Sequence, residues 1–99
     1  YAYGDLDMVE VMREATRILH LDHPYGDWPL SVGARPAAAM GLQGAGMIRP
    51  GAPADLILFR ARHMTEWLSR PQADRIVLRN GKVLDAEVPD WRELDHLFQ

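Results

Sequence analysis

The sequence predicts an α+β fold in which several helices accompany a small sheet of three strands. Near the N-terminus, apolar side chains recur at the spacing of an amphipathic helix. In the middle of the chain, a stretch rich in glycine and proline leads into the apolar run 54–59, which has the length and composition of a buried strand. Further on, Asn80-Gly81 separates two short β-type runs and predicts a hairpin, because both turn positions favour a positive φ.

Composition and charge restrict the class of protein. A chain of 99 residues forms at most one small domain, and 47% hydrophobic with 25% charged residues is typical of a globular protein. The net charge of −3 comes without any basic block, so we expect no nucleic-acid partner. The apolar runs are too short for a membrane span. The absence of cysteine excludes disulfides and thiolate metal sites, and it agrees with a cytoplasmic location.

The first predicted helix runs from about Leu6 to His20. Asp5 or Asp7 is a suitable cap, and Asp7 and Glu10 have the spacing of a capping box. Acidic residues come early in the segment and basic residues late, which suits the helix dipole. The apolar stripe consists of Met8, Val11, Met12, Ala15, Ile18 and Leu19. Such a stripe needs a partner surface.

Two short helices with a break between them are predicted next. After a loop, Asp27 is a suitable cap for a helix that ends near Gly33. Arg35 precedes a proline and is expected to avoid helical angles, whereas Pro36 suits the first turn of a new helix. Gly41 is expected to end that second helix.

The second half of the chain predicts the sheet. Residues 44–53 form a tight connection into a strand over Asp55–Phe59. A short helix follows, with Met64, Trp67 and Leu68 on one face, and Pro71 ends it. Strands at 75–79 and 82–84 flank the hairpin turn. A sheet of three strands is marginal unless it packs on helices or joins another sheet.

The tail is predicted to be an amphipathic terminal helix. Asp90 is a suitable cap, and the apolar face consists of Trp91, Leu94, Leu97 and Phe98.

Two groups of residues have the spacing of a reactive site, but each has a simpler structural role. His20 and His23 are three residues apart, and a metal site would need a third ligand such as Asp22 or Asp27. At a helix C-terminus, His20 is sufficiently explained by the dipole. Asp5 and Asp7 have the appearance of a carboxylate pair, and helix capping explains both.

The remaining candidates also favour structural roles. Asp55, at a strand start, is expected to accept hydrogen bonds from nearby backbone. His63 and His96 are isolated and are expected on the solvated surface. The glycines at 44, 46 and 51 do not match a phosphate loop. Ser31 and Ser69 lack the nucleophile elbow of a catalytic serine. We expect Trp28, Trp67 and Trp91 to anchor a core or an interface. We therefore predict no catalytic, cofactor-binding or metal-binding residue in this chain.

Four segments, taken in order, resemble the metal-dependent amidohydrolases, and the cytosine deaminase-like members in particular. The central one is a G-x-I-x-x-G-x-x-A-D-L pattern followed by a strand. Gly33 and Arg35 depart from the family pattern, which often has Thr and Asn there. The four segments are residues 1–8, 32–42, 46–56 and 76–84.

The resemblance implies that this chain is a C-terminal fragment of a larger enzyme. Residues 1–43 would supply the last helix of a (β/α)₈ barrel and the short helices after it. Residues 44–86 would form the C-terminal part of a small β-sandwich beside the barrel, and residues 87–99 a terminal amphipathic helix or tail. The role of the fragment would be structural, and it would be inactive alone.

The resemblance also implies the chemistry of the parent enzyme. In that family a divalent zinc or iron ion activates a water molecule, which attacks the ring carbon that bears the amino group of a pyrimidine base. The family holds the metal with a His-x-His pair, which this sequence lacks. The family's aspartate at the eighth strand would precede Tyr1, which itself would lie near the pocket rim. This fragment is thus expected to bind no metal or cofactor.

Two other interpretations stay open at this point. In the first, the parent enzyme is a different amidohydrolase, such as a dihydroorotase-like cyclic amidase or an N-acyl amino-acid deacylase. Alternatively, the chain would be a stand-alone oligomerisation module. In either case the uncovered apolar stripe and sheet edge predict self-association into a homo-oligomer.

Overall fold

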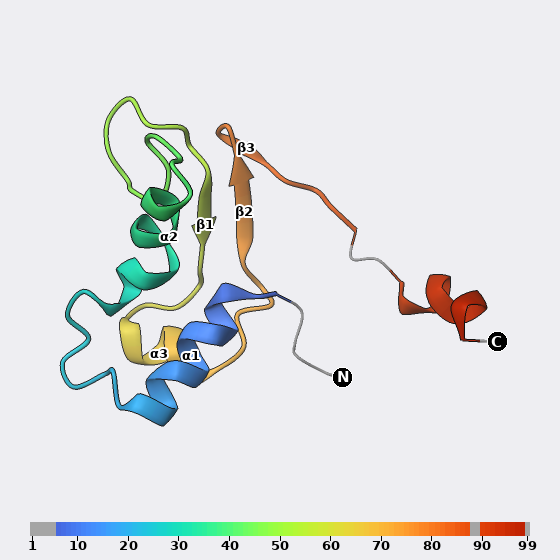
Figure 1. Cartoon of the computed structure of the whole chain (residues 1–99), viewed down its shortest axis with the longest axis horizontal. Helices are drawn as coiled ribbons and strands as arrows, with labels where there is room; N and C mark the ends of the chain where they lie inside the picture. The colour runs from blue at the N-terminus through green and yellow to red at the C-terminus, as the bar shows by residue number, and fades with distance from the viewer. Residues whose placement is uncertain (1–5, 88–89, 99) are drawn as a thin grey trace.

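The computed structural model describes residues 6–87 and 90–98 (Figure 1). The α-helices are α1 (Met8–Leu19), α2 (Ala34–Ala39) and α3 (Met64–Ser69), and the 3₁₀ helices are η1 (Trp28–Val32) and η2 (Trp91–Leu97). The strands β1 (Leu56–Leu58), β2 (Ile76–Arg79) and β3 (Lys82–Val83) form an antiparallel sheet in the order β1-β2-β3. These elements occur in the predicted order.

Helix α1 is capped at both ends by residues that the sequence indicated. The Asp7 carboxylate accepts a hydrogen bond of 3.0 Å from the Val9 N–H, so Asp7 is the N-cap. The helix ends at His20, which has a left-handed φ of 55° and whose N–H donates to the Thr16 carbonyl oxygen. The predicted helix is confirmed. The alternative cap, Asp5, lies outside the described residues.

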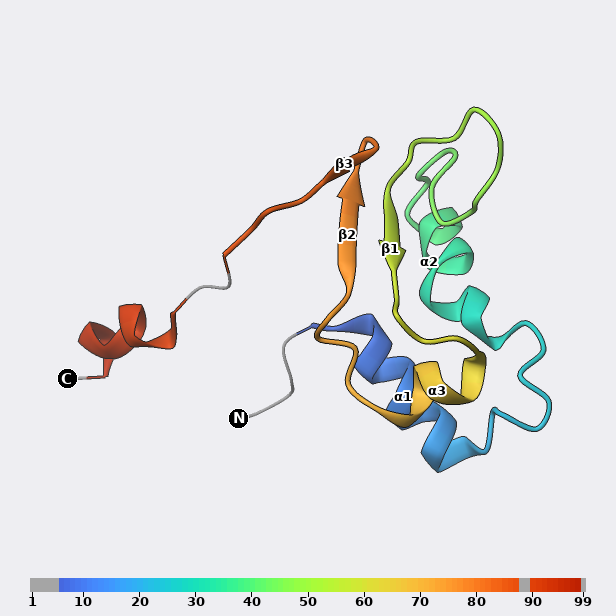
Figure 2. The same ribbon diagram turned by 180° about the vertical axis from the view of Figure 1, so that it is seen from behind.

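The face of α1 that packs overlaps the predicted stripe only in part. Val9, Met12 and Thr16 are buried, and α1 contacts α3 and η1. Figures 1 and 2 show α1 and α3 together at one end of the strands. The predicted stripe members Ile18 and Leu19 remain 72% and 64% exposed. Of the predicted stripe, Met12 is buried, whereas Met8, Val11, Ile18 and Leu19 are exposed, so most of the stripe still lacks the partner surface that the sequence indicated it needs.

The break between the two short helices falls at Gly33, two residues before the predicted break at Arg35. Helix α2 begins at Ala34, so Arg35 is helical although it precedes a proline. Pro36 is the third helical residue, where the backbone nitrogen needs no acceptor; the Ala37 N–H makes the bond to the Gly33 oxygen at 3.2 Å. Gly41, with φ of 70°, follows the end of α2 as predicted.

The segment before α2 is η1, which forms without the predicted side-chain cap. Asp27 precedes η1, but its carboxylate makes no capping hydrogen bond. Residues 28–32 fold as a 3₁₀ helix with a proline in the first turn, as expected for a short piece between two connections.

The sheet contains the predicted hairpin, but β1 is not a buried strand. Asn80 and Gly81 have φ values of 49° and 76°, which are the angles that the tight turn requires. On β1, Ile57 and Leu58 are 46% and 47% exposed. The prediction of a buried strand is wrong, because β1 is an edge strand that pairs with β2 on one side and has no described strand on the other.

The tail forms a 3₁₀ helix where an α-helix was predicted. Asp90 caps η2, accepting 3.0 Å from the Arg92 N–H, as predicted. Figure 1 shows η2 at the end of an arm that leads away from the sheet, and no described helix or strand packs against it. Within the described ranges, no helix combines the length and apolarity needed to cross a bilayer.

Candidate functional site

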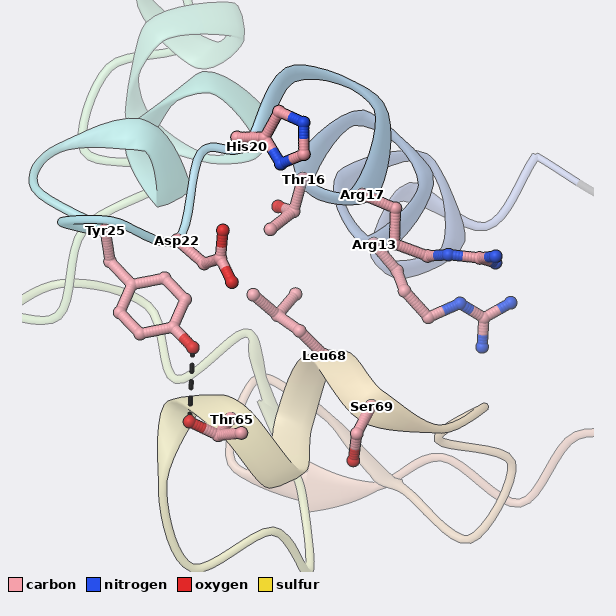
Figure 3. Close-up of a pocket in the computed structure, with 9 residues that line it drawn as sticks. All are labelled: Arg13, Thr16, Arg17, His20, Asp22, Tyr25, Thr65, Leu68 and Ser69. Atoms are coloured by element: carbon pink, nitrogen blue, oxygen red, sulfur yellow. Dashed lines mark hydrogen bonds between the residues drawn. The ribbon is translucent and has the colours of Figure 1, made fainter.

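A polar pocket of about 350 Å³ lies between α1, the following loop and α3. Figure 3 shows its nine lining residues. Arg13 and Arg17 form ion pairs with Glu14 at 3.5 Å and 3.2 Å, and their guanidinium groups point away from Tyr25 (Figure 3). The Asp22 carboxylate also lines the pocket and points toward Leu68 (Figure 3), so one carboxylate is directed into the pocket while the guanidinium groups lie at its side.

The hydroxyl groups around this pocket bond to the protein itself. Tyr25 and Thr65 join their hydroxyls at 3.3 Å across the pocket (Figure 3). Thr16 donates to a backbone oxygen one turn earlier in α1, at 2.7 Å, and Ser69 donates to one in α3, at 3.1 Å. None of these hydroxyls has the adjacent base that an activated nucleophile requires.

The structure does not assemble the two histidines considered as metal ligands. His20 lines the pocket, while His23 is exposed with Nδ1 3.2 Å from the Asp22 carbonyl oxygen. Asp27, the other suggested ligand, stands at the start of η1. Across residues 6–87 and 90–98, no group of three or more His, Cys, Asp or Glu side chains is placed to hold a metal ion.

Asp7 has a structural role beyond its helix cap. The Arg75 guanidinium forms a bidentate pair with the Asp7 carboxylate, with Nη1 2.9 Å from Oδ1 and Nη2 hydrogen-bonded to Oδ2. Both side chains are about one-fifth exposed. The hydrogen bond from Arg75, followed by that from the Val9 N–H, holds the pKa of Asp7 below its ordinary value. Asp5, the other half of the considered carboxylate pair, lies outside the described residues.

Arg75 was missed by sequence reasoning, although it contacts three separate parts of the chain, at Asp7, Phe59 and Gln72. Its Nε donates to the Gln72 carbonyl oxygen at 2.6 Å, and its guanidinium carbon lies 5.8 Å from the centre of the Phe59 ring. The Phe59 ring meets Trp67 of α3 edge-on, with centres 5.6 Å apart. Because Arg75 and Asp7 are 68 positions apart, no local pattern predicts their pairing.

Gln72 was also missed, and it closes the C-terminal end of α3. It is 1% exposed, and its Nε2 donates to the carbonyl oxygens of Trp67 and Glu66 at 2.9 Å and 3.2 Å. A helix stopped by Pro71 without a following glycine leaves carbonyls that need donors. The lack of backbone donors for these carbonyl oxygens was the signal in the sequence that could have predicted a side-chain cap nearby.

Asp55 has the predicted structural role. Its Oδ1 accepts 2.8 Å from the Asn80 N–H in the hairpin turn, and its Oδ2 lies 3.4 Å from the Arg79 guanidinium. The neighbouring Ala54 carbonyl oxygen accepts 3.0 Å from Gly81. The aspartate in the signature pattern therefore fastens the start of β1 to the turn between β2 and β3.

Replacing Asp55 by alanine is expected to loosen the hairpin turn. Loss of one partly exposed hydrogen bond and its ion pair costs about 1 kcal/mol of unfolding free energy. The Asn80 amide should exchange faster with deuterium in Asp55→Ala than in the parent protein. Asp55→Asn is the matched control, because its amide oxygen still accepts from Asn80. Equal exchange in all three proteins would contradict this assignment.

Two other candidates make local contacts. His63, predicted to be a solvated surface residue, is exposed but also caps α3, with Nδ1 accepting 3.3 Å from the Glu66 N–H. Ser31 donates to the Trp28 carbonyl oxygen at 2.6 Å. Both groups stabilise short helices.

The tryptophans differ in their surroundings. Trp67 is partly buried against Phe59, in line with the prediction of an anchor. Trp28 and Trp91 are 45% and 79% exposed, so neither is a core anchor among the described residues.

The glycine-rich connection positions a close crossing of two backbones. Gly46 has φ of 74°, and a Cβ there would lie 2.7 Å from the Gly33 carbonyl and 2.8 Å from the Ala34 Cα. Gly51 has a similar φ of 81° but open space around it. Gly46 therefore lets the connection 44–53 pack closely against the η1–α2 junction. This is a structural role and not that of a phosphate loop.

A second depression is mainly apolar. We call it the β1–α3 groove; it measures about 500 Å³, and its lining includes Ile57, Leu58, Phe59, Met64, Trp67 and the cation Arg62. It lies beside the open side of β1. Its side chains are suited to binding an apolar segment and carry no catalytic pair.

Comparison with known proteins relates the chain to a deaminase. Over 95 residues, 96% of this chain, it is 60% identical to a curated relative, of which it spans 22% of the length. That relative is the pterin deaminase of Rhizobium rhizogenes (strain K84 / ATCC BAA-868). No family model matches the chain, and no solved structure matches it.

Proposed function

We propose that this chain is the C-terminal, supporting portion of a hydrolytic deaminase of the amidohydrolase kind. The observation that carries the proposal is the 60% identity over 95 residues to a pterin deaminase. The structure supports a supporting role, because Asp7, Asp55 and His63 bond to backbone N–H groups. A cyclic amidase, a deacylase and a stand-alone module are not favoured by that relative.

The proposed architecture follows the resemblance in the sequence. Residues 1–43 are assigned to the last barrel helix and the helices after it, residues 44–86 to a small β-sandwich, and residues 87–99 to a tail. The exposed stripe of α1 and the open side of β1 are surfaces that a larger protein would cover. The absence of cysteine supports a cytoplasmic location.

The net reaction exchanges a ring amino group for an oxygen. Water adds to the ring carbon, the C–N bond breaks, ammonia leaves, and the product retains a ring carbonyl. The described residues do not fit a metal centre, since they bring together no set of three ligands. We therefore assign the zinc or iron expected in this family, and the proton transfers, to the remainder of the enzyme.

The substrate is proposed to be a pterin. The relative's name favours a pteridine, in which the aminopyrimidine ring is fused to a pyrazine, whereas the sequence resemblance pointed to a free pyrimidine such as cytosine. Both rings carry an amino group on a carbon between or beside ring nitrogens, so the same exchange applies to each.

Substrate depletion by the full-length protein tests both levels of this proposal. We expect ammonia release with pterin and little with cytosine, followed by an enzymatic ammonia assay and by chromatography of the deaminated ring. Turnover of cytosine alone would overturn the pterin assignment and leave the deaminase class intact. Absence of ammonia release from both compounds would overturn the class.

The supporting role has its own control. A protein consisting of residues 1–99 alone is expected to release no ammonia from pterin at any added zinc or iron concentration. Turnover by those residues alone would show that the reaction centre lies within them, contrary to the proposal.

A further inference from the structure

The hairpin turn at Asn80-Gly81 carries a reactive pair of residues. Asn80 is the single asparagine of the 99-residue sequence, and a glycine follows it. Because glycine has no side chain to shield its backbone nitrogen, that nitrogen can attack the carboxamide carbon of the preceding asparagine and close a five-membered imide. Asparagine is among the thermally labile residues. Both residues are exposed at the tip of the hairpin, so water and hydroxide reach them.

Two hydrogen bonds from the turn to the start of β1 oppose this reaction. The Gly81 N–H donates to the Ala54 carbonyl oxygen at 3.0 Å, and the Asn80 N–H donates to Asp55 Oδ1 at 2.8 Å. Attack requires the Gly81 nitrogen to lose its proton and to turn toward the Asn80 side chain. The first bond stabilises the N–H, and both bonds together keep Asn80 at its left-handed φ of 49°. The turn is therefore unreactive while Ala54 and Asp55 remain bonded to it.

The segment that makes these bonds can open locally. Figures 1 and 2 show the start of β1 beside the tip of the hairpin. Ala54 and Asp55 lie between the glycine- and proline-rich connection 44–53 and a strand of three residues, and the Asp55 side chain is 38% exposed. Short segments with exposed hydrogen bonds open at a fraction of the free energy of global unfolding. The turn thus alternates between a bonded and a released state.

We propose that Asn80 is a modification site that converts spontaneously to aspartate and isoaspartate, at a rate set by the bonds from Ala54 and Asp55 to the turn. Hydroxide removes the Gly81 N–H proton, and the nitrogen forms a bond to Asn80 Cγ. The Cγ–Nδ2 bond breaks, and Nδ2 leaves as ammonia after taking a proton from water. Water then opens the imide at Cγ, which gives aspartate, or at the backbone carbonyl carbon, which gives isoaspartate. The net change consumes one water molecule and releases one ammonia molecule.

Conversion prevents the turn from returning to its bonded state. A carboxylate at position 80 is close to the Asp55 carboxylate, and the two negative charges repel each other. Isoaspartate also adds a carbon atom to the backbone, which disturbs the pairing of Arg79 with Lys82 beside the turn. Release of the start of β1 therefore becomes irreversible once Asn80 has reacted. This site does not depend on the deaminase assignment or on the ring that the enzyme deaminates.

Peptide mapping of the full-length protein, incubated at mildly alkaline pH without substrate, tests the proposal. Chromatography and mass spectrometry separate the asparagine, aspartate and isoaspartate forms of the peptide that contains residue 80. The folded parent should convert at least about tenfold more slowly than the same protein unfolded in guanidinium chloride, where the turn is released. Gln43-Gly44, an exposed glutamine before a glycine, is the internal control. Its imide would need a six-membered ring, so it should stay unchanged in both states.

Substitutions of Asp55 test the role of its bond, at a temperature at which circular dichroism shows every protein folded. Asp55→Ala removes the acceptor of the Asn80 N–H and should convert about fivefold faster than the folded parent. Asp55→Asn retains an acceptor oxygen and should convert at close to the parent rate. The comparison of folded with unfolded parent decides the proposal without either variant. Equal rates in those two states, equal rates in parent and Asp55→Ala, or no isoaspartate in the unfolded parent would each overturn it.

Discussion

Replacing Gly46 by alanine is expected to destabilise the protein by about 3 kcal/mol or more. Two costs add. A left-handed φ of 74° costs a residue with a Cβ about 1–2 kcal/mol. The new Cβ would also lie 2.7 Å from backbone atoms of Gly33, and a backbone cannot rotate out of the way as a flexible side chain can. Chemical denaturation of Gly46→Ala and the parent protein measures the difference.

Gly51→Ala separates the two costs. Gly51 has φ of 81°, and a methyl group added there would meet nothing within 4 Å, so alanine should cost only the backbone term, about 1 kcal/mol. If Gly46→Ala and Gly51→Ala lower the unfolding free energy equally, the close crossing between the connection and the η1–α2 junction is contradicted.

Replacing Arg75 by methionine is expected to cost about 2–3 kcal/mol at neutral pH. The substitution removes a two-pronged, charge-assisted pair and leaves the partly buried Asp7 carboxylate without it. Arg79→Met, at the far end of β2, is the matched control. Arg79 is 65% exposed and pairs with Asp55 at 3.4 Å, so its removal should cost less than about 1 kcal/mol.

The effect of Arg75→Met should depend on pH in one direction. The pairing lowers the pKa of Asp7 in the folded protein below its ordinary value of 3.8. Stabilisation from the ionised carboxylate is therefore complete well above that value and is lost as the pH falls through the lower, folded pKa. The difference in unfolding free energy between parent and Arg75→Met should shrink between pH 5 and pH 2. A difference that stays constant over this range would contradict the ion pair as its source.

Local signals in the sequence predicted the elements well. The cap at Asp7, the turn at Asn80-Gly81, the role of Asp55 and the cap at Asp90 each depend on residues and backbone preferences that a short window contains. Arg35 was mispredicted because the rule for residues before proline yields when the proline falls in the first turn of a helix.

Tertiary features were largely beyond such signals. The Asp7–Arg75 pair and the crossing of Gly46 over Gly33 join distant parts of the chain, and no alternation or capping pattern encodes them. Burial was mispredicted for β1, because apolar composition shows that a surface needs a partner and not that the same chain supplies it. For the stripe of α1, the sequence predicted only the need for a partner surface, and most of the stripe is exposed. The candidate site could be predicted only as a set of structural roles.

The bonds that Asp55 and Ala54 make to the hairpin turn have a consequence for how the chain folds. Asn80 completes its turn with a carboxylate 25 positions earlier, so a seemingly local hairpin is finished only when a distant strand arrives. The 25-position segment between Asp55 and Asn80 must close first, and the turn by itself does not offset the entropic cost of that closure. Formation of the hairpin and arrival of β1 should therefore be a single kinetic step, with contact order and not turn propensity setting its rate.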